Sequence, residues 1–267
     1  MKLLVTTSEL INEERIFRFE YMKESFESIA RIQTDYTKII VSINMVDDDL
    51  LEQFASQFRH IPVDIEYRQT DVSKLYNPYL LCWEHKNYMQ EFLDSDFTHF
   101  IYYENDIRIT QYNIDYWLET RELFLRNGLN FIPGMSRIEV DNRGFVYSLD
   151  ILVRENRPIV TVEDRKFVSL VSPYHAMFIM DRALVQEHLS SPFFTFDPDR
   201  TFWGVSEQAN VGNYYDNVPE GLTHRSLIPI DQFDKCWVHH LPNKFVNLPN
   251  DTFGKLPIMQ VIPNLEL

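Results

Sequence analysis

Through the first half of the chain, short apolar runs typical of buried β-strands alternate with segments whose apolar residues recur at helical spacing. The expected strands are Lys2–Thr7, Lys38–Ile43, Val63–Tyr67 and Phe97–Ile107. The expected helices are Asn12–Ile32, the segment after Asp47-Asp48-Asp49, Tyr79–Leu93 and Ile114–Leu125. Because parallel strands need helical crossovers between them, this alternation predicts an α/β fold, with a mostly parallel central sheet flanked by helices on both faces.

The second half of the sequence is less regular. Its expected strands are Phe131–Val140, Phe145–Val153, Ile159–Val162, His175–Met180, Leu227–Ile230 and Lys235–His239. Its expected helices are Asp181–Leu189, capped by Asp181, and Glu207–Tyr215. No linker-like stretch divides the chain, so we expect a single domain over residues 1–267, in which the proline-containing residues 248–267 form a surface tail.

The aspartates Asp47, Asp48 and Asp49 allow two interpretations. They could belong to a metal site, or they could lie at the start of a helix, where carboxylates accept hydrogen bonds from free backbone N–H groups. The helical spacing of Leu50 and Phe54 behind them favours the helix start.

Composition excludes several classes of protein. The net charge is −15, and Lys and Arg are not clustered, so no nucleic-acid-binding surface is expected. Cys82 and Cys236, the two cysteines, are too few for a disulfide framework or a Cys-rich zinc site. The apolar start, MKLLVTTSEL, is too short for a signal peptide or a membrane span. We therefore expect a cytoplasmic protein with at most peripheral membrane contact.

The usual phosphate-binding loops are missing from a sequence that has seven glycines. There is no G-x-G-x-x-G after the first expected strand and no G-x-x-x-x-G-K-[ST], so neither a dinucleotide-binding motif nor a P-loop is present. Any bound phosphate would have to be held by a metal ion or by isolated Lys and Arg side chains.

The segment F100-I-Y-Y-E-N-D106 carries two acids at the end of an apolar run. If the strand continues through them, Glu104 and Asp106 point to the same side and repel each other unless a cation lies nearby. Mg²⁺ or Mn²⁺ would suit two carboxylates combined with substrate phosphates. The alternative, which the spacing leaves open, is that Glu104 pairs with Arg108 or Lys86 and Asp106 begins a turn.

The segment Tyr79–Ile109 resembles the nucleotide-sugar half of glycosyltransferases with the GT-A fold, which carry an acidic DXD motif after an apolar strand. Here the motif reads Glu104-Asn105-Asp106, with Glu in place of the first Asp, and the preceding helix contains Lys86-Asn87. The resemblance implies a GT-A-like domain. Residues 1 to about 110 would form its nucleotide-sugar half and residues 111–247 its acceptor half. It also implies that Asp106 binds Mn²⁺ or Mg²⁺, that Glu104 holds the ribose or a metal-bound water, and that Lys86 neutralises phosphate.

Two later segments also resemble this family. F202-W-G-V-S-E207 is similar to a W-G-x-x-E region whose acid lies near the acceptor hydroxyl, which implies Glu207 as general base and Trp203 as part of the acceptor site. Without the resemblance, the segment by itself favours a buried aromatic at a turn followed by a solvated helix-start acid.

In C236-W-V-H-H-L-P-N-K244, the resemblance implies a histidine metal ligand, His239 or His240, and a diphosphate contact from Lys244. Adjacent strand residues point in opposite directions, so one histidine at most would ligate. The resemblance favours His239, because its spacing to Lys244 is closer to the layout of retaining members of the family. The alternative is one buried and one exposed histidine.

By the same resemblance, Thr6 and Thr7 at the end of the first strand, together with the adjoining Ser8, and Asp71 after the third, would contact the nucleotide. The expected activity is transfer of a sugar from a nucleoside diphosphate sugar, preferably a UDP-sugar, to a carbohydrate hydroxyl. We expect an inverting reaction in glycan biosynthesis. In a retaining enzyme, which the sequence leaves open, Glu207 would orient the acceptor instead. Two alternatives stay open, namely a sugar-phosphate nucleotidyltransferase and a non-catalytic carbohydrate-binding protein.

Overall fold

The computed structural model describes residues 1–12, 19–152, 158–170, 176–199, 204–211 and 218–262. The chain divides into two compact units, one of residues 1–107 and 176–212 and the other of residues 108–175 and 213–267. The first unit therefore contains a segment that the sequence analysis assigned to the acceptor half. Among the described helices, none is long and apolar enough to cross a membrane.

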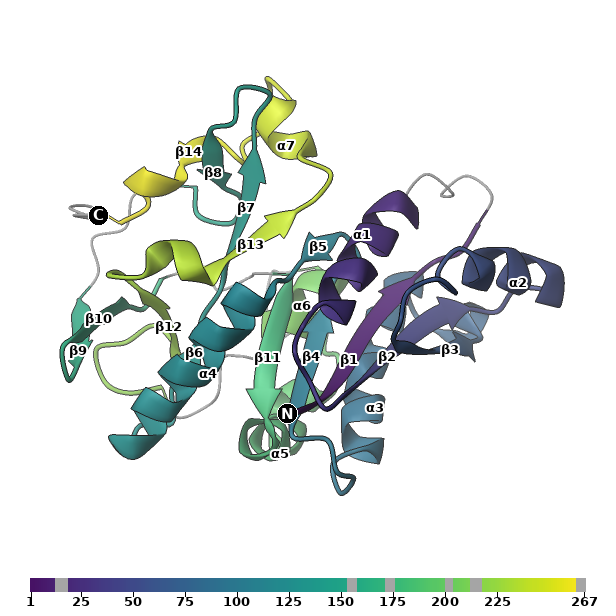
Figure 1. Ribbon diagram of the computed structural model, residues 1–267, viewed down its shortest axis with the longest axis horizontal. Helices are drawn as coiled ribbons and strands as arrows, with labels where there is room; N and C mark the ends of the chain where they lie inside the picture. The colour runs from purple at the N-terminus through teal and green to yellow at the C-terminus, as the bar shows by residue number, and fades with distance from the viewer. Residues whose placement is uncertain (13–18, 153–157, 171–175, 200–203, 212–217, 263–267) are drawn as a thin grey trace. The chain divides into compact units, whose positions relative to one another are not determined.

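The first unit is built on a five-stranded sheet (Figure 1). In spatial order its strands are β11 (Met177–Asp181), β4 (His99–Tyr103), β1 (Lys2–Glu9), β2 (Tyr36–Asn44) and β3 (Asp64–Thr70). Strands β1 to β4 are parallel, and Val5 at the centre of β1 lies between Ile39 and Ile101. Strand β11 is antiparallel to β4. The predicted α/β class and mostly parallel sheet are confirmed.

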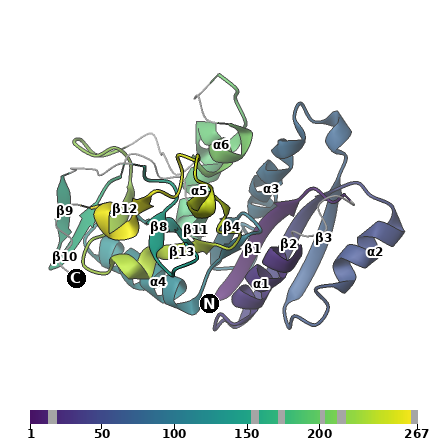
Figure 2. The same ribbon diagram turned by 90° about the horizontal axis from the view of Figure 1, so that it is seen from above.

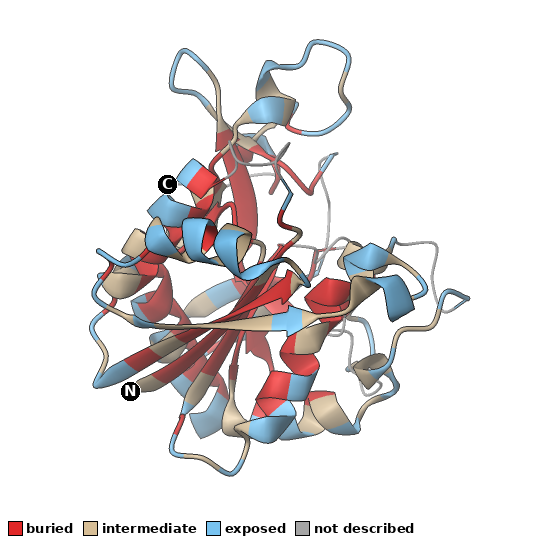
Figure 3. Ribbon diagram, turned by 90° about the vertical axis from the view of Figure 1, so that its right-hand side faces the viewer, coloured by how far each residue is buried: buried red, intermediate tan, exposed pale blue. Residues whose placement is uncertain are grey.

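Helices cover both faces of this sheet, as Figure 2 shows for α1, α2 and α3. On one face lie α1 (Phe19–Ala30) and α2 (Asp48–Ser56), whose Phe19 and Phe54 rings pack edge to face with centroids 4.8 Å apart. On the other lie α3 (Glu84–Glu91) and α5 (Arg182–Ser190). Buried residues run along the strands between these layers (Figure 3). Asp47 caps α2, accepting a hydrogen bond from the Leu50 N–H at 2.8 Å, which confirms the helix-start interpretation of the three aspartates.

Two expected elements of this unit are interrupted. The segment expected as the helix Tyr79–Leu93 begins as a 3-10 helix, η3 (Pro78–Trp83), and continues as α3. The strand expected over Phe97–Ile107 ends at Tyr103, and a turn closed by the Ile107 N–H on the Glu104 carbonyl (3.1 Å) precedes the short β5 (Ile107–Arg108). The shorter elements η2 (Val72–Lys74), η4 (Pro192–Phe194) and α6 (Val205–Val211) complete the described part of the unit.

The second unit contains two further sheets. One has the order β6 (Ile132–Pro133), β12 (Ser226–Pro229), β10 (Arg165–Val168) and β9 (Ile159–Val162). The other has the order β14 (Leu256–Pro257), β8 (Val146–Ser148), β7 (Ser136–Val140), β13 (Trp237–His240) and β5. Helix α4 (Gln111–Arg126) packs Phe124 against Phe167 at a centroid distance of 4.9 Å. The helix α7 (Lys244–Asn247) follows β13 after the short connection Leu241-Pro242-Asn243.

Local pattern predicted neither β10 nor β14, and it predicted one strand where β6 and β7 are separate. The two separate around Gly134, where a Cβ would lie 2.7 Å from the Ser226 Oγ and 3.1 Å from the Leu227 carbonyl. This close approach of β12 requires glycine at position 134. Because β12 lies about 90 residues further along the chain, local pattern could not show the approach.

Candidate functional site

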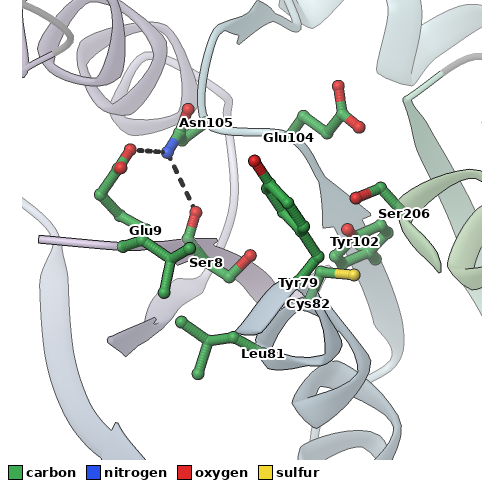
Figure 4. Close-up of a pocket in the computed structure, with 10 residues that line it drawn as sticks. Ser8, Glu9, Tyr79, Leu81, Cys82, Tyr102, Glu104, Asn105 and Ser206 are labelled. Atoms are coloured by element: carbon green, nitrogen blue, oxygen red, sulfur yellow. Dashed lines mark hydrogen bonds between the residues drawn. The ribbon is translucent and has the colours of Figure 1, made fainter. Parts of the chain in front are cut away.

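A pocket with about 560 Å³ of empty space opens at the carboxyl ends of β1 and β4 in the first unit (Figure 4). Its lining comes from the end of β1, from η3, from β4 and the turn after it, and from α6. The lining residues are Ser8, Glu9, Leu10, Tyr79, Leu81, Cys82, Tyr102, Glu104, Asn105 and Ser206. The pocket lies where ligands bind in open α/β sheets, beyond the carboxyl ends of parallel strands.

The wall formed by η3 depends on a local turn signal. Asn77 precedes Pro78 and caps η3, its side chain accepting a hydrogen bond from the Tyr79 N–H at 2.9 Å. Proline at the first position of a helix loses no hydrogen bond there, so Asn-Pro starts this turn readily. The turn brings Tyr79, which is 52% exposed, and the buried Cys82 to the pocket.

The inner wall is an aromatic stack. Tyr102 of β4 stacks on His85 of α3 at a centroid distance of 4.1 Å, and both are buried. Burial lowers the pKa of His85 well below its usual value, so its ring is neutral. Burial also raises the pKa of the Cys82 thiol to about 12, so this thiol is not a nucleophile at neutral pH.

The turn Glu104-Asn105-Asp106 is held to β1 by its central residue. The Asn105 side-chain amide donates to the Ser8 carbonyl at 3.0 Å and also to Glu9 Oε2, as the dashed lines in Figure 4 show. Asn105 and Asp106 are 6% and 4% exposed, whereas Glu104 is half-buried and lines the pocket.

The expectation that strand alternation directs Glu104 and Asp106 to the same side is wrong, because β4 ends at Tyr103. The two carboxylates take their directions from the turn. Asp106 belongs to the first unit, whereas His239 and His240 belong to the second. Among the described residues, no three His, Cys, Asp or Glu side chains are grouped in a way that could hold a metal ion.

The residues expected to contact the nucleotide have different surroundings. Thr6 is fully buried and donates from Oγ1 to the Ile101 carbonyl at 3.0 Å, and Thr7 is 2% exposed. The next residue, Ser8, lines the pocket. Asp71 caps η2 by accepting hydrogen bonds from Ser73, and these bonds hold the pKa of its carboxyl below the usual value.

Lys86 is 1% exposed, and its ammonium donates to the Phe193 carbonyl while it lies over the Trp83 ring. Glu207 lies in the first turn of α6 and is half-buried. Its carboxylate folds back towards Gly204, where a Cβ would lie 2.5 Å from Oε2. Trp203 lies outside the described residues.

His239 and His240 lie in β13, and burial alternates along this strand, so the two side chains have different surroundings. Both ring nitrogens of His239 contact side chains: Nδ1 is 2.9 Å from Arg108 Nη2, and Nε2 is 2.8 Å from Asn243 Oδ1. Metal binding by His239 would therefore break one of these contacts.

His240 is 3% exposed, and its Nδ1 lies 2.5 Å from Oε1 of the buried Glu139. A carboxylate on one ring nitrogen is the arrangement that orients histidines which bind metal through the other nitrogen. Burial raises the pKa of Glu139, but the hydrogen bonds of its carboxylate with His240 and the Val246 N–H outweigh this and leave the pKa below its usual value. Lys244, at the start of α7, is exposed.

Five residues that line the pocket were not expected from sequence to have a role there, namely Tyr79, Cys82, Tyr102, Asn105 and Ser206. The signal that could have identified Tyr79 is the preceding Asn77-Pro78, which marks a turn on the carboxyl side of the third strand. Ser206 comes from α6, which the local pattern could not assign to this pocket.

No protein-family model and no curated protein matches this chain. Among solved structures, Staphylococcus aureus TarS residues 1–349 are similar to it with a TM-score of 0.42 and 15% identity, over 79% of this chain and 56% of that chain. The same region in complex with UDP-GlcNAc is similar with a TM-score of 0.40 and 14% identity, over 79% of this chain and 54% of that chain. Mouse xyloside xylosyltransferase 1 is similar with a TM-score of 0.30 and 14% identity, over 53% of each chain. This chain thus matches little more than half the length of these proteins. Similarity at these TM-scores establishes neither a shared fold nor a shared activity.

Proposed function

We propose that this protein is a glycosyltransferase that transfers a sugar from a nucleoside diphosphate sugar, preferably a UDP-sugar, to an acceptor hydroxyl. The observation that carries the proposal is the pocket at the carboxyl ends of β1 and β4, which Glu104 of the acidic triplet lines. The sequence resemblance described above supports the same donor class, because the triplet follows the apolar strand in the expected order.

The proposal includes a divalent cation, Mn²⁺ or Mg²⁺. These ions take oxygen ligands and are commonly held by one or two protein carboxylates together with substrate phosphates. The carboxylates of Glu104 and Asp106, two residues apart in one turn, fit that donor set. The ion would supply positive charge that stabilises the leaving diphosphate.

Glu207 is the proposed general base. It follows Ser206, which lines the pocket, in the same turn of α6. In an inverting displacement, the acceptor oxygen forms a bond to the anomeric carbon, the bond from that carbon to the diphosphate breaks, and Glu207 takes the acceptor proton. The product would be a glycoside, and the role we propose for this reaction is in glycan biosynthesis.

The test is a thermal-shift measurement with UDP and a panel of UDP-sugars, each with and without Mn²⁺. A ligand that binds the folded protein raises its unfolding temperature. We expect at least one UDP-sugar to do so only with Mn²⁺, D106N to abolish the shift, and E122Q, a change at an exposed glutamate of α4, to retain it.

Product analysis separates the proposal from its rivals. Release of UDP from the stabilising sugar nucleotide, with transfer to a carbohydrate, supports the proposal. Release of pyrophosphate from UTP and a sugar phosphate would instead identify a nucleotidyltransferase. If no nucleotide changes the unfolding temperature with or without Mn²⁺, the proposal is wrong.

A further inference from the structure

Trp83, at the end of η3, and Lys86, in the first turn of α3, are buried against each other. They are 8% and 1% exposed, and the Lys86 ammonium lies 3.7 Å from the centre of the indole ring. Their spacing of three residues puts both side chains on one face of the helical segment. An ammonium over an indole face is attracted by the ring quadrupole, most strongly where water is excluded.

The indole of Trp83 contacts helix α6. Its Nε1–H donates to the backbone oxygen of Val205, the first residue of α6, at 2.9 Å, although the two residues are 122 positions apart in sequence. Because a buried N–H without an acceptor is costly, this hydrogen bond favours one position of the helix start relative to η3. The ring also packs edge to face with Phe196, with centroids 5.5 Å apart.

Lys86 contacts η4, the element that precedes α6 in the chain. Its ammonium donates to the carbonyl of Phe193 in η4. A buried ammonium needs acceptors around it, so its position and that of the Phe193 carbonyl depend on each other. The Trp83–Lys86 pair thus links η3 and α3 to η4 on one side and to the start of α6 on the other.

Helix α6 is the element that these contacts hold at the pocket. It brings Ser206 into the lining, and Glu207 follows with its carboxylate beside Gly204. A displacement of the helix start would therefore move both side chains together.

We infer that Trp83 and Lys86 are positioning residues that hold the α6 wall of the pocket, and that Lys86 acts through the indole and the Phe193 carbonyl instead of touching substrate phosphate. The expected effect of these residues on ligand binding rests on the proposed function. Their expected effect on the position of α6 does not, because it follows from contacts within the protein.

The first test is amide hydrogen exchange of the ligand-free protein. W83F removes the indole donor and keeps an aromatic ring, and K86M removes the ammonium and keeps the stem. We expect either change to speed exchange in α6 about ten-fold, with exchange in β1 and β4 unchanged. K23M, at an exposed lysine of α1, is the matched control and should change neither. Unchanged exchange in α6, or an equal rise across the sheet, would overturn the inference.

The second test compares the affinities of uridine and UDP, measured by calorimetry with Mn²⁺ present. A positioning role predicts that K86M and W83F weaken both ligands by the same factor. A selective loss of UDP affinity in K86M would show direct phosphate contact and overturn the assignment of Lys86. If the wild type binds neither ligand, the proposed function fails, and hydrogen exchange alone decides the inference.

Discussion

Asn105 donates a hydrogen bond from its side-chain amide to the backbone oxygen of Ser8 at 3.0 Å, and this bond fastens the turn after β4 to the end of β1. The same amide bonds the carboxylate of Glu9. Ser8, Glu9 and Asn105 all line the pocket, so one side chain determines how two of its walls meet.

Replacement of Asn105 by alanine should lower the free energy of unfolding by about 1–3 kcal/mol, because one buried and one partly buried hydrogen bond are lost and their acceptors stay in place. Chemical denaturation measures this difference. N142A, at an exposed asparagine, should be neutral. If N105A unfolds with wild-type stability, the turn is not held by these bonds.

The two cysteines should be unreactive in the folded protein. Both are buried, and burial raises the pKa of the Cys82 thiol to about 12 and that of Cys236 well above its usual value. We expect no reaction with a disulfide reagent near neutral pH and two reacting thiols after unfolding. Rapid reaction of one thiol in native C236A would contradict the buried position of Cys82 in the pocket wall.

Glu66 of β3 gives the stability a defined pH dependence. Arg68 bonds its carboxylate at 2.6 Å and Lys38 at 2.7 Å, and together they hold its pKa below the usual 4.5 against the effect of burial. Because this pKa is lower in the folded state, the stabilisation is fully present above about pH 4.5 and is lost as the pH falls through the folded value.

We therefore expect E66Q to lower the free energy of unfolding by at most about 1 kcal/mol near neutral pH, since the pair is partly exposed. The difference from wild type should shrink on acidification. Denaturant titrations across this range measure it, with E119Q, at an exposed glutamate of α4, as the control. A difference that stays constant with pH would rule out the ion pairs as its source.

E207Q should lower kcat of the proposed transfer by about 100- to 10,000-fold while the affinity for UDP stays unchanged, because glutamine cannot accept the acceptor proton. Steady-state kinetics with calorimetry measures both quantities, and E220Q, at an exposed glutamate, should behave as wild type. Transfer at the wild-type rate by E207Q would remove Glu207 from the mechanism.

Local pattern predicted much of the first unit. The expected strands Lys2–Thr7 and Lys38–Ile43 lie within the observed Lys2–Glu9 and Tyr36–Asn44. A short apolar run indicates a buried strand from the residues of that segment alone. Asp181 caps α5, accepting a hydrogen bond from the Leu184 N–H at 2.9 Å, because helix caps are formed by residues close in sequence. The acidic triplet was also found from sequence, since it follows an apolar strand.

Tertiary structure alone decided the features that depend on a contact between residues far apart in the chain. After β4 ends, the Glu104 N–H bonds the Ala176 carbonyl at 2.8 Å, in a segment that periodicity could not assign to this sheet. Lys86 was expected at a phosphate and is instead buried against Trp83 and Phe193. The sequence by itself therefore determined the α/β class and the acid-bearing strand end. The direction of each site side chain depends on hydrogen bonds and packing between distant segments, which local spacing does not encode.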